Sequence, residues 1–137
     1  MRGGFKSDQE VITAPAVEVD QEVIRQVKLA TEVERQVIVH VLIRFSETPS
    51  LIRIWQSTFL FPAGGGSPSQ LLNADNITFY PTWMEVRQKQ HKFTLIFEGL
   101  PKDCKSFDLV EVIPQDGGFE VLGIPRNKTD VYEVEIS

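Results

Sequence analysis

The segment 36–45, with the sequence QVIVHVLIRF, constrains the fold more than any other part of this chain. Apolar side chains recur in it at every second position. They are Val37, Val39, Val41, Ile43 and Phe45. A period of two places these side chains on one face of an extended strand, whereas a helix would scatter them around its axis. The opposite face is partly apolar too, which indicates a central strand that is covered on both sides.

Similar alternation returns along the rest of the chain. It predicts further strands at 51–61, 82–87, 91–98, 107–113, 119–124 and 131–136. Clusters of proline, glycine and asparagine separate these segments, and residues 76–80 form a shorter strand or turn. Valine, isoleucine and threonine together are more than twice as frequent as alanine and leucine, which favours strands over helices. We therefore expect an all-β fold, an antiparallel immunoglobulin-like β-sandwich of seven to nine strands.

The first part of the chain has a different composition. Residues 1–18 mix polar, glycine and proline residues without a period, which predicts a flexible arm before a single β-sandwich domain at 19–137. Residues 22–33 fit both a helix and a strand, and we favour the strand. The start of the chain shows no signal peptide and no segment is apolar enough to span a membrane. The chain as written is therefore expected in the cytoplasm, with a removed export signal as the alternative.

Length and charge exclude several classes of function. A chain of 137 residues has room for one domain of ordinary size, and it can bury its own core without disulfides or metals. Cys104 is the sole cysteine, so neither a disulfide nor a thiolate zinc site is expected. The net charge of -5 argues against general affinity for nucleic acid or anionic membranes.

The sequence offers little for catalysis. Only His40 and His91 supply imidazole groups, and no nucleophile motif accompanies either of them. The segment 63–69, AGGGSPS, lacks the lysine and the following helix of a phosphate-binding loop, so it predicts a flexible hairpin loop. The aspartates between 103 and 116 do not follow the spacing of a calcium loop. We expect no catalytic residue, no cofactor and no metal ion.

Two segments carry a pattern of alternating core residues and a proline corner: 51–61, LIRIWQSTFLF, and 93–111, FTLIFEGLPKDCKSFDLVE. The residues that carry it are Ile52, Arg53, Ile54, Thr58, Leu60, Phe93, Leu95, Phe97, Leu100, Pro101, Lys102, Ser106, Phe107, Asp108 and Glu111. Over roughly residues 22–124 the chain thereby resembles a group of uncharacterised bacterial immunoglobulin-like β-sandwich domains, which are often found beside secreted modules. The resemblance implies a β-sandwich and an accessory role, and it brings no catalytic residue.

Arg53, Trp55, Tyr80 and Trp83 are the candidate binding residues. Aromatic side chains and arginine are the usual anchors of interfaces and of carbohydrate stacking, but they also fill sandwich cores, and the sequence leaves both interpretations open. The leading hypothesis is a non-enzymatic accessory module that binds another protein or domain, in an oligomeric state that the sequence does not reveal. The alternative is a sandwich that binds a carbohydrate or small ligand through exposed aromatic residues. A hydrolase would need a histidine beside a carboxylate in a cleft.

Overall fold

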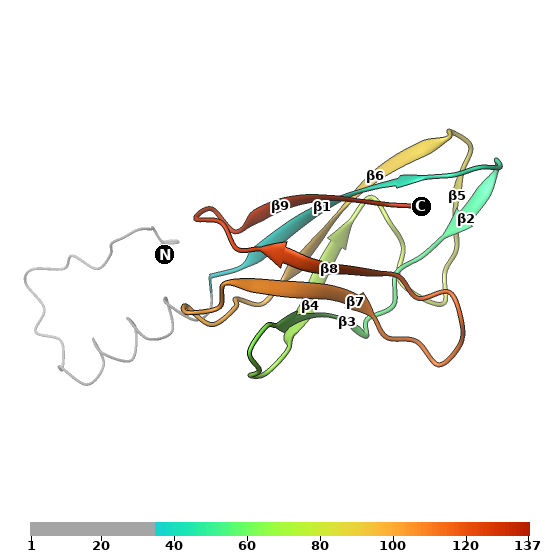
Figure 1. Ribbon diagram of the computed structural model, residues 1–137. Coiled ribbons are helices and arrows are strands. Elements are labelled where there is room, and N and C mark those ends of the chain that lie inside the picture. Colours follow the sequence, from blue (N-terminus) through green and yellow to red (C-terminus); the bar gives the residue numbers. More distant parts are fainter. Residues whose placement is uncertain (1–34) are drawn as a thin grey trace, which may run out of the picture. The chain divides into compact units, whose positions relative to one another are not determined.

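The structure, a computed structural model, describes residues 35–137 (Figure 1). These residues form strands joined by turns and loops, and the all-β prediction is confirmed. The strands are β1 (Val37–Arg44), β2 (Ser50–Ile52), β3 (Thr58–Pro62), β4 (Ser69–Asp75), β5 (Met84–Val86), β6 (Gln90–Phe97), β7 (Ser106–Glu111), β8 (Glu120–Pro125) and β9 (Val131–Ile136). Within this part of the chain there is no helix of the length and apolar character needed to cross a membrane. The predicted arm at 1–18, the domain start at residue 19 and the strand at 22–33 lie outside the described residues.

Seven of the nine described strands form one mixed sheet, in the order β8-β7-β3-β4-β6-β1-β9. Figure 1 shows that this sheet curls strongly, so that its shape approaches a barrel. β8 and β9 are its two edge strands. β2 and β5 pair in a second, two-stranded sheet. Along the chain β2 follows β1 and β5 precedes β6 (Figure 1).

The first and last described strands pair in parallel. β1 lies between β6 and β9, antiparallel to β6 and parallel to β9, with Ile38 opposite Val131 and Ile43 opposite Ile136. The prediction of a purely antiparallel architecture is therefore wrong at this pairing. Parallel strands need a long connection, and the chain supplies one because all the other strands lie between β1 and β9. Alternation of side chains is the same for both strand directions, so it could not reveal this difference.

The alternating face of β1, β6 and β7 forms much of the core. Its buried side chains are Val37, Val39, Val41, Phe93, Leu95, Phe97, Phe107 and Leu109. Phe107 of β7 also meets Tyr132 of β9 edge to face, with the ring centroids 5.0 Å apart. Because β7 and β9 are not neighbours in the sheet, this contact crosses the interior of the curled sheet.

Residues 51–61 do not form the single long strand that the sequence predicts. β2 ends at Ile52 and β3 begins at Thr58, and residues 53–57 connect two different sheets. The buried Thr58 hydroxyl donates a hydrogen bond to the Trp55 carbonyl at 2.7 Å, which gives that carbonyl a local partner within the break. β4 is a second difference, because the sequence SQLLNAD forms a strand although it contains no β-branched residue.

A buried carboxylate fixes the connection between β8 and β9. Asp130 is 2% exposed and accepts hydrogen bonds from Arg126 Nε at 2.6 Å and from the Tyr132 hydroxyl at 2.9 Å. Arg126 also donates to the carbonyls of Pro101 and Cys104, at 2.8 and 3.1 Å. Burial raises the pKa of Asp130, but the hydrogen bonds from Arg126 and Tyr132 outweigh burial, and the pKa lies below its ordinary value of 3.8. This ion pair holds the start of β9 against the corner that precedes β7.

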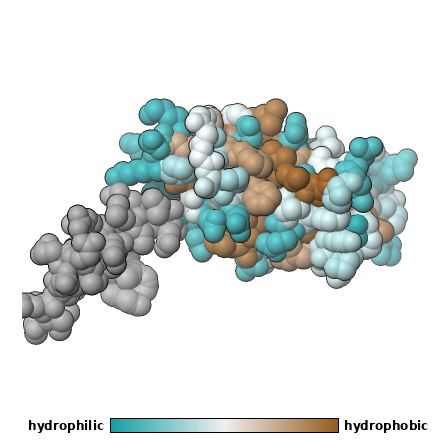
Figure 2. Space-filling view, turned by 90° about the horizontal axis from the view of Figure 1, so that it is seen from below, coloured by the Kyte–Doolittle hydropathy of each residue, from teal (hydrophilic) through white to brown (hydrophobic). Residues whose placement is uncertain are grey.

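Apolar side chains also reach the surface. Figure 2 shows hydrophobic residues gathered across the middle of one face, with hydrophilic residues on either side. The large apolar side chains with high exposure in residues 35–137 are Leu51, Leu72, Tyr80, Trp83, Val112, Leu122 and Val131. Single exposed apolar residues are common on proteins, so only a cluster of them indicates function. Tyr80 and Trp83 belong to such a cluster.

Candidate functional site

The break between β2 and β3 lies beside the segment that precedes β5. The backbone N–H of buried Ile54 donates to the Thr78 carbonyl at 2.8 Å, and the Ile54 carbonyl accepts from the Tyr80 N–H at 2.8 Å. These bonds form a short parallel bridge between the two segments. Side chains alternate along extended backbone, so Arg53 and Trp55 point away from the side on which Ile54 is buried.

Arg53 meets Trp83 because of the register of the small sheet. Ile52 of β2 lies opposite Met84 of β5, and the next step of this antiparallel register places Arg53 opposite Trp83. The guanidinium carbon of Arg53 lies 3.7 Å from the centroid of the Trp83 ring, which makes a close cation–π contact. Arg53 also donates a hydrogen bond to the Pro81 carbonyl at 3.1 Å. Both contacts hold the guanidinium at the surface between the two segments.

Trp55 and Tyr80 complete the group of aromatic rings around this guanidinium. Their rings stack with centroids 3.8 Å apart and planes 5° from parallel. The Arg53 guanidinium carbon lies 4.6 Å from the Tyr80 ring centroid and 5.8 Å from that of Trp55. We call Arg53, Trp55, Tyr80 and Trp83 the aromatic–arginine cluster. The structure thus brings together all four residues that the sequence singles out.

The aromatic–arginine cluster lies at the surface and not in the core. Trp83 is 51% exposed and Tyr80 is 43% exposed, while Arg53 and Trp55 are half-buried. The sequence left open whether these side chains fill the core or form a patch, since large aromatic rings suit both places. In the structure Ile54 takes the core position of this segment instead.

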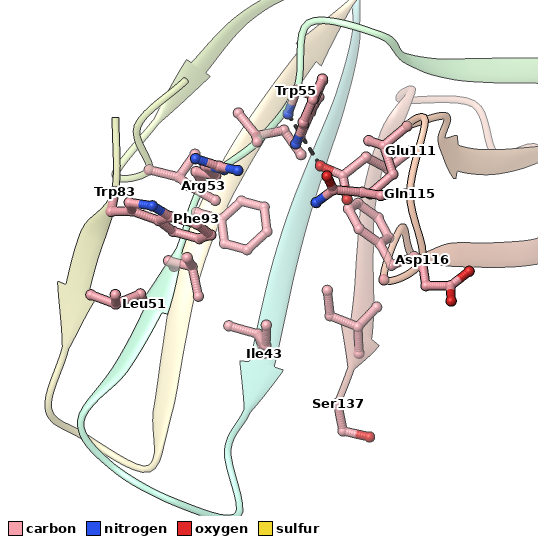
Figure 3. A pocket seen from close by; sticks show the side chains of 17 residues that line it. Ile43, Leu51, Arg53, Trp55, Trp83, Phe93, Glu111, Gln115, Asp116 and Ser137 are labelled. Atoms are coloured by element: carbon pink, nitrogen blue, oxygen red, sulfur yellow. Dashed lines mark hydrogen bonds between the residues drawn. The ribbon is translucent and has the colours of Figure 1, made fainter. Parts of the chain in front are cut away.

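A cavity of about 350 Å³ opens beside the cluster. Much of its wall is apolar, formed by Ile43, Ile52, Ile54, Phe93, Phe119 and Ile136 among others. Figure 3 shows Leu51, Arg53 and Trp83 on one side of the cavity and Glu111, Gln115 and Asp116 on the other. A space of this volume, with apolar walls and a few polar groups, is typical of ligand-binding pockets.

Glu111, the last residue of β7, is the most deeply buried polar side chain of the cavity wall. It is 9% exposed, and its Oε2 accepts a hydrogen bond from the Trp55 backbone N–H at 3.1 Å (Figure 3). Burial raises the pKa of Glu111 above its ordinary value of 4.5 and outweighs the backbone hydrogen bonds of Trp55 and Phe119 and the charge of Arg53, which lower it. None of the ion pairs between described residues includes Glu111.

Glu111 is not among the site residues predicted from the sequence, although the sequence contains a signal for it. Phe107, Leu109 and Glu111 share one face of β7, because alternate side chains of a strand point the same way. An acidic side chain on the core face of a strand must find hydrogen-bond partners, or it marks a functional site. The alternation within SFDLVE therefore contained the prediction that Glu111 is buried.

The turn after β7 supplies the remaining polar wall. Gly118 approaches β7 so closely that a Cβ atom there would collide with the Glu111 carbonyl oxygen. This position therefore requires glycine, and the close approach brings the exposed residues Gln115 and Asp116 to the cavity. Two carboxylates, those of Glu111 and Asp116, thus line the same cavity as the single guanidinium of Arg53.

The other candidate residues lie elsewhere. His40 Nδ1 is 2.8 Å from the Thr94 hydroxyl, and His91 Nε2 is 2.8 Å from the Asn76 carbonyl oxygen. Neither histidine lines the cavity. Cys104 is buried and its thiol donates to the Ser106 carbonyl at 3.1 Å. Within residues 35–137 no three metal-binding side chains gather as they would around a metal ion.

Three features of one surface therefore point to a function. They are the aromatic–arginine cluster, the apolar cavity beside it and the buried carboxylate of Glu111. No family model, no curated protein and no solved structure matches the chain.

Proposed function

We propose that this chain is a non-enzymatic binding module that holds another protein at the aromatic–arginine cluster and the adjoining cavity. The observation that carries the proposal is the exposure of large apolar side chains at the cavity rim, where Leu51 is 57% exposed and Trp83 is 51% exposed. The few residues that supply most of the binding energy at protein interfaces are enriched in tryptophan, tyrosine and arginine. A partner that covers this rim would remove those surfaces from water.

Contacts within the cluster support this role because they order the side chains before a partner arrives. The Arg53 guanidinium is held between the Trp83 ring and the Pro81 carbonyl. Trp55 and Tyr80 stack on each other. Each flexible side chain that becomes fixed on binding costs roughly 0.5–1.5 kcal/mol. Side chains that are ordered in the free protein avoid much of that cost.

The positions of the titratable groups support a role without catalysis. Histidine most readily carries acid–base chemistry near neutral pH, and both histidines lie outside the cavity wall. The carboxyl groups of the wall belong to Glu111 and Asp116. Among the described residues, no hydrogen bond joins either carboxyl group to a hydroxyl or a thiol that could act as a nucleophile.

Carbohydrate binding is the weaker alternative. A sugar ring stacks on an open aromatic face. Trp55 already stacks on Tyr80, and the Arg53 guanidinium lies against Trp83. Binding of a small apolar ligand has more support, because the cavity has the volume and the apolar walls of a ligand pocket.

We also infer that the fold is related to immunoglobulin-like β-sandwiches, and to the uncharacterised bacterial domains that the sequence resembles. The segments 51–61 and 93–111 support this kinship, because they contribute β3, β6 and β7 to the large sheet. An experimental structure of one such bacterial domain tests the inference. The same strand order with a parallel pair of first and last strands is expected, and a different order would contradict the kinship.

Selection from a random peptide library displayed on phage, with the full chain immobilised, tests the proposed function. We expect enriched peptides whose affinity falls at least about tenfold when Trp83 is replaced by alanine, as for a tryptophan at the centre of an interface. Leu122→Ala, which removes an exposed apolar side chain from β8, is the matched control and leaves affinity unchanged. Absence of enriched peptides, or peptides that bind both variants as tightly as the parent, would contradict the proposal.

A further inference from the structure

We propose that the cavity receives a lysine side chain of the partner protein, with its ammonium group beside Glu111 and its carbon stem along the apolar wall. This inference rests on the proposed function and names the chemistry that the partner presents. Three observations carry it. They are the shape and lining of the cavity, the missing counter-charge of Glu111, and the excess of negative charge around the cavity.

The lining of the cavity matches the two parts of a lysine side chain. Lysine carries a compact charge on a four-carbon apolar stem. The inner wall offers isoleucine and phenylalanine side chains to the stem, including Ile52 and Phe93. Trp55 and Trp83 also line the cavity and extend its apolar surface along the stem. An apolar passage therefore leads toward a buried carboxylate (Figure 3).

Glu111 has hydrogen-bonding capacity that the described residues do not fill. A carboxylate can accept about four hydrogen bonds. The described donors to Glu111 are the backbone N–H groups of Trp55 and Phe119. A buried charge is costly unless it is paired and hydrogen-bonded. An ammonium group brings three donors and a positive charge, so it would supply both.

The charges around the cavity also favour a cation. Glu111 and Asp116 line it together with a single cationic side chain, Arg53. The Arg53 guanidinium is engaged by the Trp83 ring and the Pro81 carbonyl and forms no ion pair with another described residue. The cavity therefore retains a negative charge that a partner can neutralise.

Lysine fits this place better than arginine. Arginine pairs best with a carboxylate through two parallel hydrogen bonds, one to each oxygen. The Trp55 N–H already uses one acceptor position of Oε2, so a paired arginine would have to share that oxygen with it. The ammonium group of lysine makes single hydrogen bonds in any direction and needs no such pair of free oxygens.

The first test uses the full chain and two blocked amino acids, Nα-acetyl-lysine N-methylamide and its norleucine counterpart, which has the same carbon stem without the ammonium group. Binding is followed by NMR through the indole N–H signals of Trp55 and Trp83. We expect the lysine probe to bind about tenfold more tightly than the norleucine probe. Glu111→Gln should abolish this preference, and Glu133→Gln, at an exposed position of β9, should preserve it.

The outcomes of this titration separate the inference from its rivals. Equal affinity of both probes for the parent chain would overturn the inference, and this comparison needs no variant to fold. A preference for lysine that survives Glu111→Gln would also overturn it. Tighter binding of n-pentylamine than of the lysine probe would identify a free amine as the ligand. It would overturn the inference that the ammonium group belongs to a lysine of a partner protein.

The peptides from the phage selection distinguish failure of this inference from failure of the proposed function. Replacement of one lysine by norleucine should weaken a selected peptide about tenfold on the parent and not on Glu111→Gln. Peptides that depend on Trp83 but tolerate replacement of every lysine would overturn the inference and leave the proposed function standing. Absence of any selected peptide would contradict the proposed function itself. The inference that a partner protein inserts a lysine would fall with it.

Discussion

Asp130 and Glu111 are both buried carboxylates, but their partners differ. Burial raises the pKa of each. At Asp130 the hydrogen bonds from Arg126 and Tyr132 outweigh burial, so the pKa falls below its ordinary value. At Glu111 the hydrogen bonds come from backbone N–H groups and the cation Arg53 lies farther away, so burial dominates and the pKa rises. Both carboxylates are buried, so the groups that hydrogen-bond to each of them decide the difference. Asp130 is held by side chains of the fold, whereas Glu111 is available to a ligand.

Arg126→Met should lower the free energy of unfolding by about 3–5 kcal/mol, because it removes the nearer and more buried of the two arginines paired with the buried Asp130 carboxylate, and leaves only Arg35 at 3.6 Å. The matched control is Arg44→Met. The ion pair between Arg44 and Glu135, at 3.4 Å, is exposed on both sides, so its loss should cost less than about 1 kcal/mol. Urea unfolding of both variants measures the difference. Equal losses would contradict the role given to Asp130.

Glu111→Gln should change how stability depends on pH. Because the folded-state pKa of Glu111 lies above its ordinary value of 4.5, the folded chain retains a proton that the unfolded chain has released. The stability that this group contributes is complete below the ordinary value and is lost as the pH rises through the raised pKa. Glutamine does not ionise, so the melting temperature of the variant relative to the parent should rise as the pH increases from the ordinary value of 4.5 through the raised pKa.

Thermal melts of the parent and the variant across this pH range measure the effect. Glu133→Gln, at an exposed position of β9, is the control, and its difference from the parent should vary little with pH. A pH-independent difference for Glu111→Gln would show that its carboxyl group ionises as it does in water.

At the scale of elements, β7 joins the core to the cavity wall. Phe107→Ala should lower the free energy of unfolding by about 3–5 kcal/mol, because the ring is fully buried and contacts Tyr132 across the sheet interior. Leu122→Ala on the neighbouring strand β8 should cost less than about 0.5 kcal/mol, since Leu122 is 62% exposed. Chemical denaturation of both variants provides the comparison. If Phe107→Ala melts like the parent, the side chains of β7 are assigned to the wrong faces.

Strands with alternating apolar side chains could be predicted from the sequence, and strands without them could not. The predicted bounds of the strands now seen as β1, β6 and β9 differ from the observed ones by one residue at most. β4 has no β-branched residue, and its place is set by β3 and β6 on either side. The break at 53–57 was also hidden, because it depends on hydrogen bonds of Ile54 and Thr58 and not on a local pattern.

The candidate site could be predicted by residue type but not by position. Tryptophan, tyrosine and arginine drew attention to the aromatic–arginine cluster, yet their meeting depends on the register between β2 and β5. The cavity depends further on the turn at Gly118, which carries Asp116 to it from another part of the chain. Such long-range placement leaves no periodic signal in the sequence.

For the whole molecule, we predict that no hydrolytic or transfer activity depends on histidine. His40 contacts the Thr94 hydroxyl and His91 contacts the Asn76 carbonyl oxygen, and both of these oxygens are neutral. Neither histidine lines the cavity. Parent, His40→Gln and His91→Gln are assayed with esterase, phosphatase, glycosidase and peptidase substrates. Peptides selected on the parent should bind both variants unchanged. Turnover by the parent that disappears in either variant would contradict the binding-module proposal.

The parallel pairing of β1 with β9 sets how this domain responds to tension. Ile38 lies opposite Val131 and Ile43 opposite Ile136, so the start of β1 and the end of β9 are at opposite ends of the paired segment. A pull between Val37 and Ile136 loads the hydrogen bonds of this ladder together, in shear. A pull between Arg44 and Gln90, which face each other on β1 and β6, would unzip its ladder bond by bond. Single-molecule force spectroscopy should therefore record a higher rupture force for the first geometry, which would let the domain carry mechanical load along its length.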